Sequence, residues 1–297
     1  LTAGSSDVER FLDPAVKPRD VGVVGEEMKC QQPLVQQRYH VRTFDRSAPS
    51  SADKVTHLQG DLANALEVER ALEGCDVCFH CASTLLPQTS NSNPIFDIET
   101  NLKGAVTLLN AAVKANVKKI IFISSGGTVY GKPTTLPIEE SHPTKPICSY
   151  GIIKLAIEHY LALYEHLYGL QSVVLRLANP FGPRPAENAQ QGVIACFLKQ
   201  AITKGCITVW GDGTVIRDYI YISDVIEAFL CALHYTGDER IFNISSAEGR
   251  SVNEVILAIE QALKKPVKRV YTASRSCDVP ANVLAIARAQ ACLGWSP

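Results

Sequence analysis

The chain has 297 residues, 46% hydrophobic and 20% charged, which is enough for one large α/β domain with a smaller lobe and a sizeable core. Its formal net charge of −1 and sequence pI near 6.7 argue against a nucleic-acid or membrane partner. No apolar run is long enough to span a membrane and no signal-peptide pattern opens the chain, so we expect a soluble cytoplasmic protein.

From residue 39 onward, short β-branched runs alternate with helical patterns. In chain order the sequence predicts a strand over 39–44, a helix over 66–72, a strand over 77–81, a helix over 95–115, a strand over 118–124, a helix over 149–168 and a strand over 172–177. This alternation predicts parallel βαβ units, and therefore an α/β fold with a doubly wound, Rossmann-type parallel sheet. Ligands of such sheets bind at the carboxyl ends of the strands.

After about residue 180 the pattern loosens, and we expect a smaller C-terminal substrate lobe over 181–297 that also helps to complete the main sheet. Its predicted elements are helices over 192–204, 223–234 and 252–263 and strands over 207–210 and 241–244. In the first part, the helices over 95–115 and 149–168 carry apolar residues on more than one face, which predicts a partner surface in addition to the sheet. The alternative is that a longer loop covers them.

Three of the ten cysteines, Cys75, Cys78 and Cys81, form a C-x-x-C-x-x-C pattern that is also seen in iron–sulfur and zinc sites. No fourth ligand stands at a recognised spacing, and the segment 76–82 has the pattern of a buried parallel strand, where free cysteine acts as a small apolar residue. We therefore expect no metal. The other cysteines are scattered, which indicates a reducing compartment.

Tyr150 and Lys154 form the most informative pair in the chain, because they lie four residues apart in a predicted helix. Residues at this spacing share one face of a helix, so the ammonium of Lys154 can lie close to the hydroxyl of Tyr150. A nearby positive charge lowers the pKa of a tyrosine from its ordinary value of about 10 and makes the side chain a usable general base. The spacing alone also arises by chance in helices, so the surrounding motifs decide its meaning.

Further motifs surround this pair in a fixed order. They are His80-Cys81-Ala82-Ser83, then Asn101, then Ile123-Ser124-Ser125-Gly126-Gly127-Thr128-Val129-Tyr130-Gly131, then Leu175-Arg176-Leu177-Ala178-Asn179-Pro180-Phe181-Gly182-Pro183-Arg184, and last Arg217-Asp218-Tyr219-Ile220-Tyr221-Ile222-Ser223-Asp224-Val225. Over residues 34–297 the chain resembles the extended short-chain dehydrogenase/reductase family, and within it the NAD-dependent epimerase/dehydratase group of UDP-glucose 4-epimerase-like enzymes. The resemblance implies an NAD-binding Rossmann-like domain over 34–180 and a homodimer formed through 95–115 and 149–168.

The resemblance also assigns roles to single residues. Tyr150 and Lys154 are the implied catalytic pair, with a hydroxyl from Ser125 or Thr128, because Gly126 stands where relatives carry Ser or Thr. The implied cofactor-binding residues in this part are Asp45, Arg46, Asp61, Leu62, Cys81, Ala82, Ser83, Asn101, Ser124, Tyr150 and Lys154. The implied substrate-binding residues are Asn179, Arg217 and Arg275. Arginine suits a nucleotide diphosphate because its fork binds phosphate through two hydrogen bonds.

Asp45 closes the predicted strand over 39–44, where an acidic residue in dinucleotide folds accepts hydrogen bonds from the adenosine ribose and selects NAD. Arg46 follows it and could instead favour a 2′-phosphate. An aspartate at the end of a strand is also an ordinary turn residue. The sequence therefore favours NAD over NADP and leaves the second open.

Residues 1–33 depart from the family pattern, which opens with a strand and a G-x-x-G-x-x-G loop whose bare backbone lets a pyrophosphate approach a helix N-terminus. Gly22 and Gly25 supply two glycines, Met28 stands in the third place, and no preceding strand is evident. Pro33 falls in the expected helix, at a cost of about 3 kcal/mol. We expect an atypical N-terminal segment with a degenerate phosphate loop, and a C-terminal lobe truncated before the last helix of relatives.

The resemblance implies an NAD-dependent nucleotide-sugar epimerase that inverts C4 of a UDP-hexose through a transient 4-keto intermediate. The loop over 124–131 holds no Asp-Glu pair, which argues against water elimination. Two alternatives stay open. One is an NAD(P)-dependent reductase or hydroxysteroid-type dehydrogenase that consumes its cofactor, and the other is a cofactor-deficient, non-catalytic nucleotide-sugar-binding protein.

Overall fold

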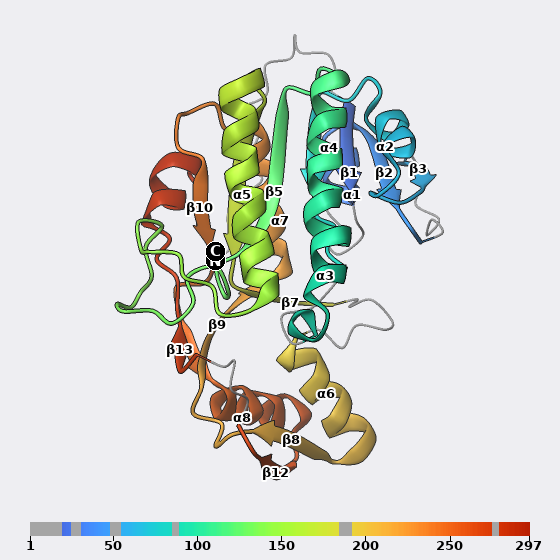
Figure 1. The fold of residues 1–297 in the computed structure, drawn as a ribbon. Coiled ribbons are helices and arrows are strands. Elements are labelled where there is room, and N and C mark those ends of the chain that lie inside the picture. Colours follow the sequence, from blue (N-terminus) through green and yellow to red (C-terminus); the bar gives the residue numbers. More distant parts are fainter. Residues whose placement is uncertain (1–19, 25–30, 48–54, 85–88, 184–191, 275–278) are drawn as a thin grey trace.

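The computed structural model describes residues 20–24, 31–47, 55–84, 89–183, 192–274 and 279–297. Figure 1 shows a central sheet with long helices in front of it and a smaller lobe below it. The strands of the sheet are β1 (Asp20–Val24), β2 (His40–Asp45), β3 (Val55–Gln59), β4 (Val77–His80), β5 (Lys119–Ser125), β6 (Gln171–Leu177) and β10 (Ile241–Ile244). Their spatial order is β10-β6-β5-β4-β1-β2-β3, and each neighbouring pair is parallel.

The strand order confirms the predicted doubly wound sheet. β2 and β3 lie on one side of β1, whereas β4, β5, β6 and β10 lie on the other, so the direction of winding reverses between β1 and β4. The carboxyl ends of the strands on both sides of this reversal form the edge at which α/β sheets bind ligands. β10 comes from the C-terminal part of the chain, as the sequence predicted for a lobe that helps to complete the sheet.

The expectation that no strand precedes residue 34 is wrong. β1 lies in the centre of the sheet and pairs with both β2 and β4. It is short and apolar, and Gly22 interrupts its pattern because Cys75 and Leu72 pack directly over this glycine. Pro33 is the third residue of α1 (Gln31–Gln36), where a missing backbone N–H costs little because the first turn of a helix has no internal acceptor for it.

Helices cover both faces of the sheet and bury two separate cores. One face is covered by α2 (Ala65–Leu72), α4 (Lys103–Lys114) and α5 (Ser149–Tyr168), which share a core with apolar side chains of β4, β5 and β6. The other face is covered by α7 (Ile222–His234), whose Phe229 packs edge-on against Phe79 of β4. Figure 1 shows α4 and α5 side by side in front of the sheet and α7 behind it.

The predicted helix over 95–115 is not continuous. It begins as α3 (Pro94–Asp97), widens into a π-helical turn (Ile98–Leu102) and continues as α4. Pro94 occupies the first helical position, and the Asn93 side chain accepts a hydrogen bond from the backbone of Phe96. π-helical turns are frequent at functional sites, and this one carries Asn101.

The smaller lobe has its own core between α6 (Val193–Lys204), α8 (Val252–Leu263) and a parallel pair of strands, β8 (Cys206–Trp210) and β12 (Lys268–Thr272). Four short strands connect it to the main sheet. They are β7 (Asn179–Phe181), β9 (Ile216–Tyr221), β11 (Gly249–Ser251) and β13 (Ala281–Asn282). None of the helices in the described part of the chain is long and apolar enough to cross a membrane.

Candidate active site

Tyr150 and Lys154 lie on the first turns of α5, next to the carboxyl end of β5. The Nζ atom of Lys154 lies 5.5 Å from the centre of the Tyr150 ring, which confirms that the two side chains share one face of the helix. Lys154 is 4% exposed, and its ammonium donates a hydrogen bond of 2.8 Å to the carbonyl of Ile123 and lies 4.9 Å from the centre of the Phe122 ring. The hydrogen bond to β5 therefore fixes the position of the Lys154 ammonium.

The N-terminus of α5 is fixed by side chains from the preceding segment. The backbone N–H of Tyr150 donates to Ser90 Oγ at 3.1 Å, and that of Ser149 donates to Asn91 Oδ1 at 2.8 Å. The Ser149 hydroxyl donates to Asp97 Oδ2 at 2.7 Å, and Asp97 is fully buried. The first N–H groups of a helix lack internal acceptors, so these contacts both satisfy them and set the position of Tyr150.

Asn101 links the same region to the loop that follows β4. Its amide donates to Asp97 Oδ1 and to Thr84 Oγ1, both at 2.8 Å, and its carbonyl oxygen accepts from the Thr84 backbone at 2.9 Å. A small pocket opens beside it. The pocket is lined by Ala82, Ser83, Asp97, Asn101, Tyr150, Ile153, Lys154 and Ile157. Five residues that the sequence assigned to the cofactor site, Ala82, Ser83, Asn101, Tyr150 and Lys154, are thus brought together.

Cys81 and Ser124 were also assigned to the cofactor site, but they do not line this pocket and their side chains are buried. Cys81 is 1% exposed, and its N–H continues the sheet by donating to the Val24 carbonyl at 2.8 Å. The hydroxyl of Ser124 donates to the carboxylate of Glu158, inside the protein. The Ser124 side chain thus has an internal partner, the Cys81 side chain is buried, and the role of both toward a cofactor stays a prediction.

Asp45 and Asp61 lie close together at the carboxyl ends of β2 and β3, because the N–H of Gly60 donates to the Asp45 carbonyl at 2.9 Å. Each carboxylate caps its own turn: Asp45 Oδ1 accepts from Ser47 N at 2.8 Å, and Asp61 Oδ1 accepts from Ala63 N at 2.9 Å. The turn role that the sequence left open for Asp45 is present, and a half-exposed carboxylate at this edge is also placed to meet a ribose.

Two more predicted cofactor residues lie on this side of the sheet. Leu62 packs against Gly104 of α4, where an added Cβ would come within 3.2 Å of the leucine. Arg46 follows Asp45, and its carbonyl accepts a hydrogen bond of 2.9 Å from the Gln59 amide. The role of Leu62 and Arg46 toward the cofactor stays a prediction.

The prediction that Gly22 belongs to a phosphate-binding loop is wrong. Gly22 is the middle residue of β1 and pairs with Arg42 and Cys78. An added Cβ at this position would lie 3.4 Å from the Cys75 sulfur, so the glycine serves the packing of the strand. The second predicted glycine, Gly25, lies outside the described residues, and its role in a phosphate-binding loop stays a prediction.

Ser125 is the last residue of β5, and Thr128 lies in the turn that follows. Both residues are half-buried, and the hydroxyl oxygen of Thr128 is buried without a hydrogen-bond partner. At Gly126, where the sequence expected a hydroxyl, an added Cβ would overlap a terminal methyl of Leu284 and come within 3.2 Å of the Arg176 carbonyl oxygen, so a side chain there requires Leu284 to move.

The predicted substrate residues lie where the lobe meets the sheet. Asn179 donates from its amide to the Asp218 carbonyl at 2.8 Å, and Arg217 donates to the carbonyls of Ile216 and Val279, both at 2.8 Å. Asn179 begins β7 and Arg217 lies in β9, its neighbour, so the structure brings the two onto adjacent strands. Arg275 lies outside the described residues.

His80 is a residue of this site to which the sequence gave no role. It is the last residue of β4 and 3% exposed, and its ring lies 5.2 Å from that of Phe122. Neither ring nitrogen has a hydrogen-bond partner. Burial, and then the charge of Lys154, lower the pKa of His80 from 6.5 to about 3, so the imidazole is neutral at physiological pH. The sequence signal that could have identified His80 as a site residue is its place as the polar last residue of an otherwise apolar strand.

The cysteine pattern does not form a metal site in the described residues. Cys75, Cys78 and Cys81 are buried free thiols, and burial raises the pKa of both Cys75 and Cys78, which disfavours the thiolate form that binds metals. Nowhere in the described ranges do three or more His, Cys, Asp or Glu side chains gather as metal ligands do.

Comparison with known proteins places the chain in a family. The model of the NAD dependent epimerase/dehydratase family matches residues 22–245. The UDP-glucose 4-epimerase of Mycolicibacterium smegmatis is 34% identical over 257 residues, which cover 86% of this chain and 82% of that protein. The dTDP-4-dehydro-6-deoxyglucose reductase of Escherichia coli is 38% identical over 218 residues, 73% of this chain and 69% of that protein.

A solved structure agrees with this assignment. The UDP-glucose 4-epimerase of Thermotoga maritima with UDP-glucose superposes with a TM-score of 0.88 at 31% identity, over 94% of this chain and 93% of that one. The chain belongs to the NAD dependent epimerase/dehydratase family. It is an NAD-dependent enzyme of the nucleotide-sugar epimerase type within that family.

The described residues fit NAD. Asp45 and Asp61 lie at the carboxyl ends of β2 and β3, and the pocket beside Asn101 and Lys154 lies on the other side of the reversal of strand order. The ammonium of Lys154 and the amide of Asn101 supply hydrogen-bond donors among the residues that line this pocket. These are the donor types that a dinucleotide and a sugar hydroxyl require.

Proposed function

We propose that this enzyme interconverts UDP-hexoses that differ in configuration at C4. The single observation that carries the proposal is the Tyr150–Lys154 pair at the mouth of the pocket, with a buried hydroxyl on Thr128 that has no partner within the protein. The named functions of the Mycolicibacterium and Thermotoga relatives, and the UDP-glucose bound to the second, support the choice of substrate.

In this proposal the phenol of Tyr150 acts as general base and removes the proton of the sugar 4-hydroxyl. The ammonium of Lys154, held by the Ile123 carbonyl, favours the phenolate and so supports proton transfer. NAD supplies the hydride acceptor and donor at C4 when it is bound. A hydroxyl from Thr128 or Ser125 donates to the sugar oxygen, and Asn179, Arg217 and Arg275 hold the nucleotide diphosphate.

The reaction as proposed returns every hydride that it removes, so no cofactor is consumed. The 4-keto sugar turns over in the site and receives the hydride on its other face, while the proton returns to O4 from Tyr150. The balance is a change of configuration at one carbon, with no oxidation or reduction overall. A site that must hold the sugar in two orientations needs its contacts on the nucleotide, and we propose Arg217 and Arg275 for this role.

The first test is Tyr150→Phe, measured as the conversion of UDP-glucose to UDP-galactose at pH 7.5. We expect a loss of about 10² to 10⁴ in kcat, the range that a positioned general base contributes. Tyr168→Phe, at the exposed last residue of the same helix, is the matched control and should keep full activity. Intact epimerisation by Tyr150→Phe would remove the basis of the proposal.

The second candidate function is a reductase, and the 38% identity to the Escherichia coli reductase favours it. That reaction uses the same tyrosine and lysine but oxidises one NAD(P)H per product. A steady change of absorbance at 340 nm with a 4-keto sugar nucleotide, and no conversion of UDP-glucose, would replace the epimerase proposal by this one. Cofactor choice is measured in the same assay, and Asp45 leads us to propose NAD over NADP.

We also propose that the chain is a homodimer that pairs through α4 and α5. The outer side of α5 carries a stripe of exposed apolar side chains, Ile152, Tyr160, Leu163 and Leu167, each 38–55% exposed. Monomers rarely expose a continuous stripe of this kind. The eight cysteines in the described ranges are free thiols, and this supports a cytoplasmic location for the dimer.

A further inference from the structure

A buried ion pair joins α5 to β6 just below the site. Glu158 of α5 and Arg176 of β6 each have side chains 4% exposed, and they form two hydrogen bonds, Nε to Oε1 at 3.1 Å and Nη2 to Oε2 at 2.6 Å. The hydroxyl of Ser124 also donates to Oε1 of this glutamate. Burying two charges is costly even when they are paired, so such a pair is weak evidence for stability and prompts the question of what else it does.

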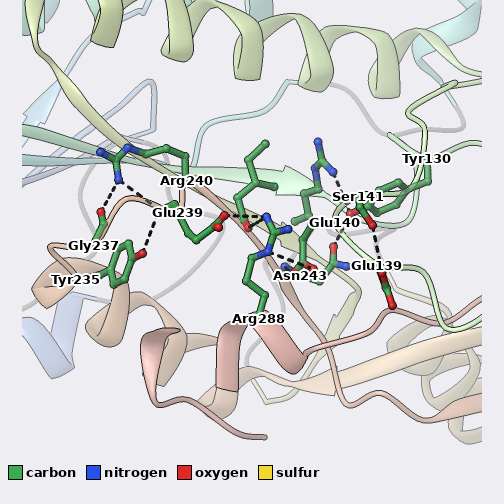
Figure 2. Close-up of polar contacts among 12 residues, drawn as sticks. Tyr130, Glu139, Glu140, Ser141, Tyr235, Gly237, Glu239, Arg240, Asn243 and Arg288 are labelled. Atoms are coloured by element: carbon green, nitrogen blue, oxygen red, sulfur yellow. Dashed lines mark hydrogen bonds and ion pairs between the residues drawn. The ribbon is translucent and has the colours of Figure 1, made fainter. Parts of the chain in front are cut away.

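Arg176 extends the contact to the loop that follows β5. Its Nη1 donates to the Tyr130 hydroxyl at 2.9 Å, and its guanidinium lies 4.9 Å from the centre of the Tyr130 ring. The Tyr130 hydroxyl in turn donates to Asn243 Oδ1 at 2.7 Å, and the Asn243 backbone N–H donates to Glu140 Oε1 at 2.8 Å. Figure 2 shows Tyr130, Asn243 and Glu140 gathered together, with Arg288 reaching the group from the C-terminal segment.

This chain of contacts runs from Glu158 through Arg176 and Tyr130 to Asn243. It connects α5, which carries Tyr150 and Lys154, to the loop that carries Thr128. On α5, Lys154 bonds to the Ile123 carbonyl and Glu158, one turn later, bonds to the Ser124 hydroxyl. Successive turns of the helix are thereby fixed to successive residues of β5. Farther along this chain of contacts, the fully buried Tyr130 lies near the end of the loop over 125–131, which carries Ser125 and Thr128.

The loop and the helix also meet directly. Gly151 follows Tyr150 on α5, and an added Cβ there would lie 2.9 Å from the Thr128 carbonyl oxygen, so only glycine permits this approach. The distance between the Thr128 hydroxyl and the Tyr150 phenol therefore depends on how firmly the loop is held against the helix. Tyr130 and Arg176 are buried and occupied by protein partners, so neither can touch a substrate.

We propose that Arg176 and Tyr130 are positioning residues that hold the loop over 125–131 against α5, and so set the separation of the Thr128 hydroxyl from Tyr150. The inference rests on the proposed epimerase function for its kinetic consequence, and on the geometry alone for its structural one. A displacement of about 1 Å between reacting groups lowers rates by as much as 10², so a loosened loop should act on kcat.

The test is Tyr130→Phe, which removes one hydroxyl and leaves the ring in place. We expect kcat for UDP-glucose to fall about tenfold or more, with KM and the calorimetric Kd for NAD changed less than about threefold. The matched control is Tyr164→Phe, which removes a 2.7 Å bond from α5 to Asn110, away from the loop. A merely structural role predicts equal kcat for both variants, and that result would overturn the proposal.

Hydrogen exchange gives a readout that does not need activity. The N–H groups of Gly126, Thr128, Val129 and Gly131 donate to backbone carbonyls within or beside the loop. In Tyr130→Phe their exchange should quicken by about fivefold, as expected for a hydrogen bond worth about 1 kcal/mol, and in Tyr164→Phe it should not change. If the wild-type enzyme lacks epimerase activity, the proposed function fails alone, and this exchange result still decides the positioning role.

Glu158→Asp is a second test of the proposal, to be used if Tyr130→Phe does not fold. It keeps the charge and draws the carboxylate back by one methylene, which should pull Arg176 away from Tyr130. If circular dichroism shows that Tyr130→Phe is unfolded, Glu158→Asp should show the same lower kcat and faster loop exchange. Unchanged values in a folded Glu158→Asp would overturn the proposal.

Discussion

At the scale of one residue, the Thr128 hydroxyl is a buried group of the candidate site that makes no hydrogen bond. A buried hydroxyl without a partner costs about 1–3 kcal/mol, and the oxygen of Thr128 is in that state. A side chain at Gly126 would require the Leu284 side chain to move. The sequence left the choice between Ser125 and Thr128 open, and the structure favours Thr128 as the residue that waits for a hydrogen-bond partner.

We therefore predict that Thr128→Val, which keeps the shape and removes the hydroxyl, lowers kcat for UDP-glucose about tenfold to a hundredfold. Ser125→Ala is the matched comparison and should lower kcat less than threefold. The assay is initial-rate conversion of UDP-glucose at saturating NAD. The opposite order of the two effects would assign the role to Ser125.

His80 links the site to the stability of the fold. Its pKa is lowered to about 3, first by burial and then by Lys154, from an unfolded value near 6.5. Between these two values the unfolded chain binds a proton that the folded chain excludes, so the free energy of unfolding falls as the pH drops below about 6.5. The slope is about 1.4 kcal/mol per pH unit, and this contribution is fully present above pH 6.5.

We predict that His80→Phe removes this slope. From pH 7.5 to 5.0 the wild-type free energy of unfolding should fall by about 2 kcal/mol more than that of the variant, as measured by urea denaturation. His159→Gln, at an exposed position of α5, is the control and should keep the wild-type dependence. Parallel curves for wild type and His80→Phe would show that His80 is not the group that titrates.

At the scale of elements, local sequence patterns predicted the long helices and missed short strands whose pairing depends on neighbouring strands. The helix over 149–168 is observed as α5 with the same bounds, because 20 residues of helical pattern end at Gly169, which adopts φ +69°. β1 escaped detection because a five-residue strand with a central glycine has almost no periodic signal. β3 (Val55–Gln59), also unpredicted, lies at the edge of the sheet, where few apolar residues are needed.

The region before α5 shows why site elements are hard to predict. The sequence read 95–115 as one helix, and the structure divides it at the π-helical turn from Ile98 to Leu102. The division brings Asn101 to Thr84 and Asp97 to Ser149, two contacts between segments 17 and 52 residues apart. Helical periodicity carries no information about such partners, since they belong to segments that are distant in the sequence.

At the scale of the whole molecule, the exposed apolar stripe of α5 predicts assembly. Replacing Leu163 and Leu167 by Glu should convert a dimer to a monomer, because the substitutions place four charges in one two-fold interface. Sedimentation velocity measures the change. Leu257→Glu, on an exposed position of α8 in the lobe, is the matched control and should leave the dimer intact. A wild-type protein that sediments as a monomer would refute the predicted homodimer.

The sequence by itself determined the alternation of strands and helices and the relation of Tyr150 to Lys154, because both follow from the 3.6-residue period of a helix and the short range of strand patterns. Only the tertiary structure decided that Gly22 is a strand residue, that the His80 ring makes no hydrogen bond, and that the buried Thr128 hydroxyl has no hydrogen-bond partner. These facts depend on which distant segments pack together. Packing of that kind is a property of the whole fold, which no local pattern records.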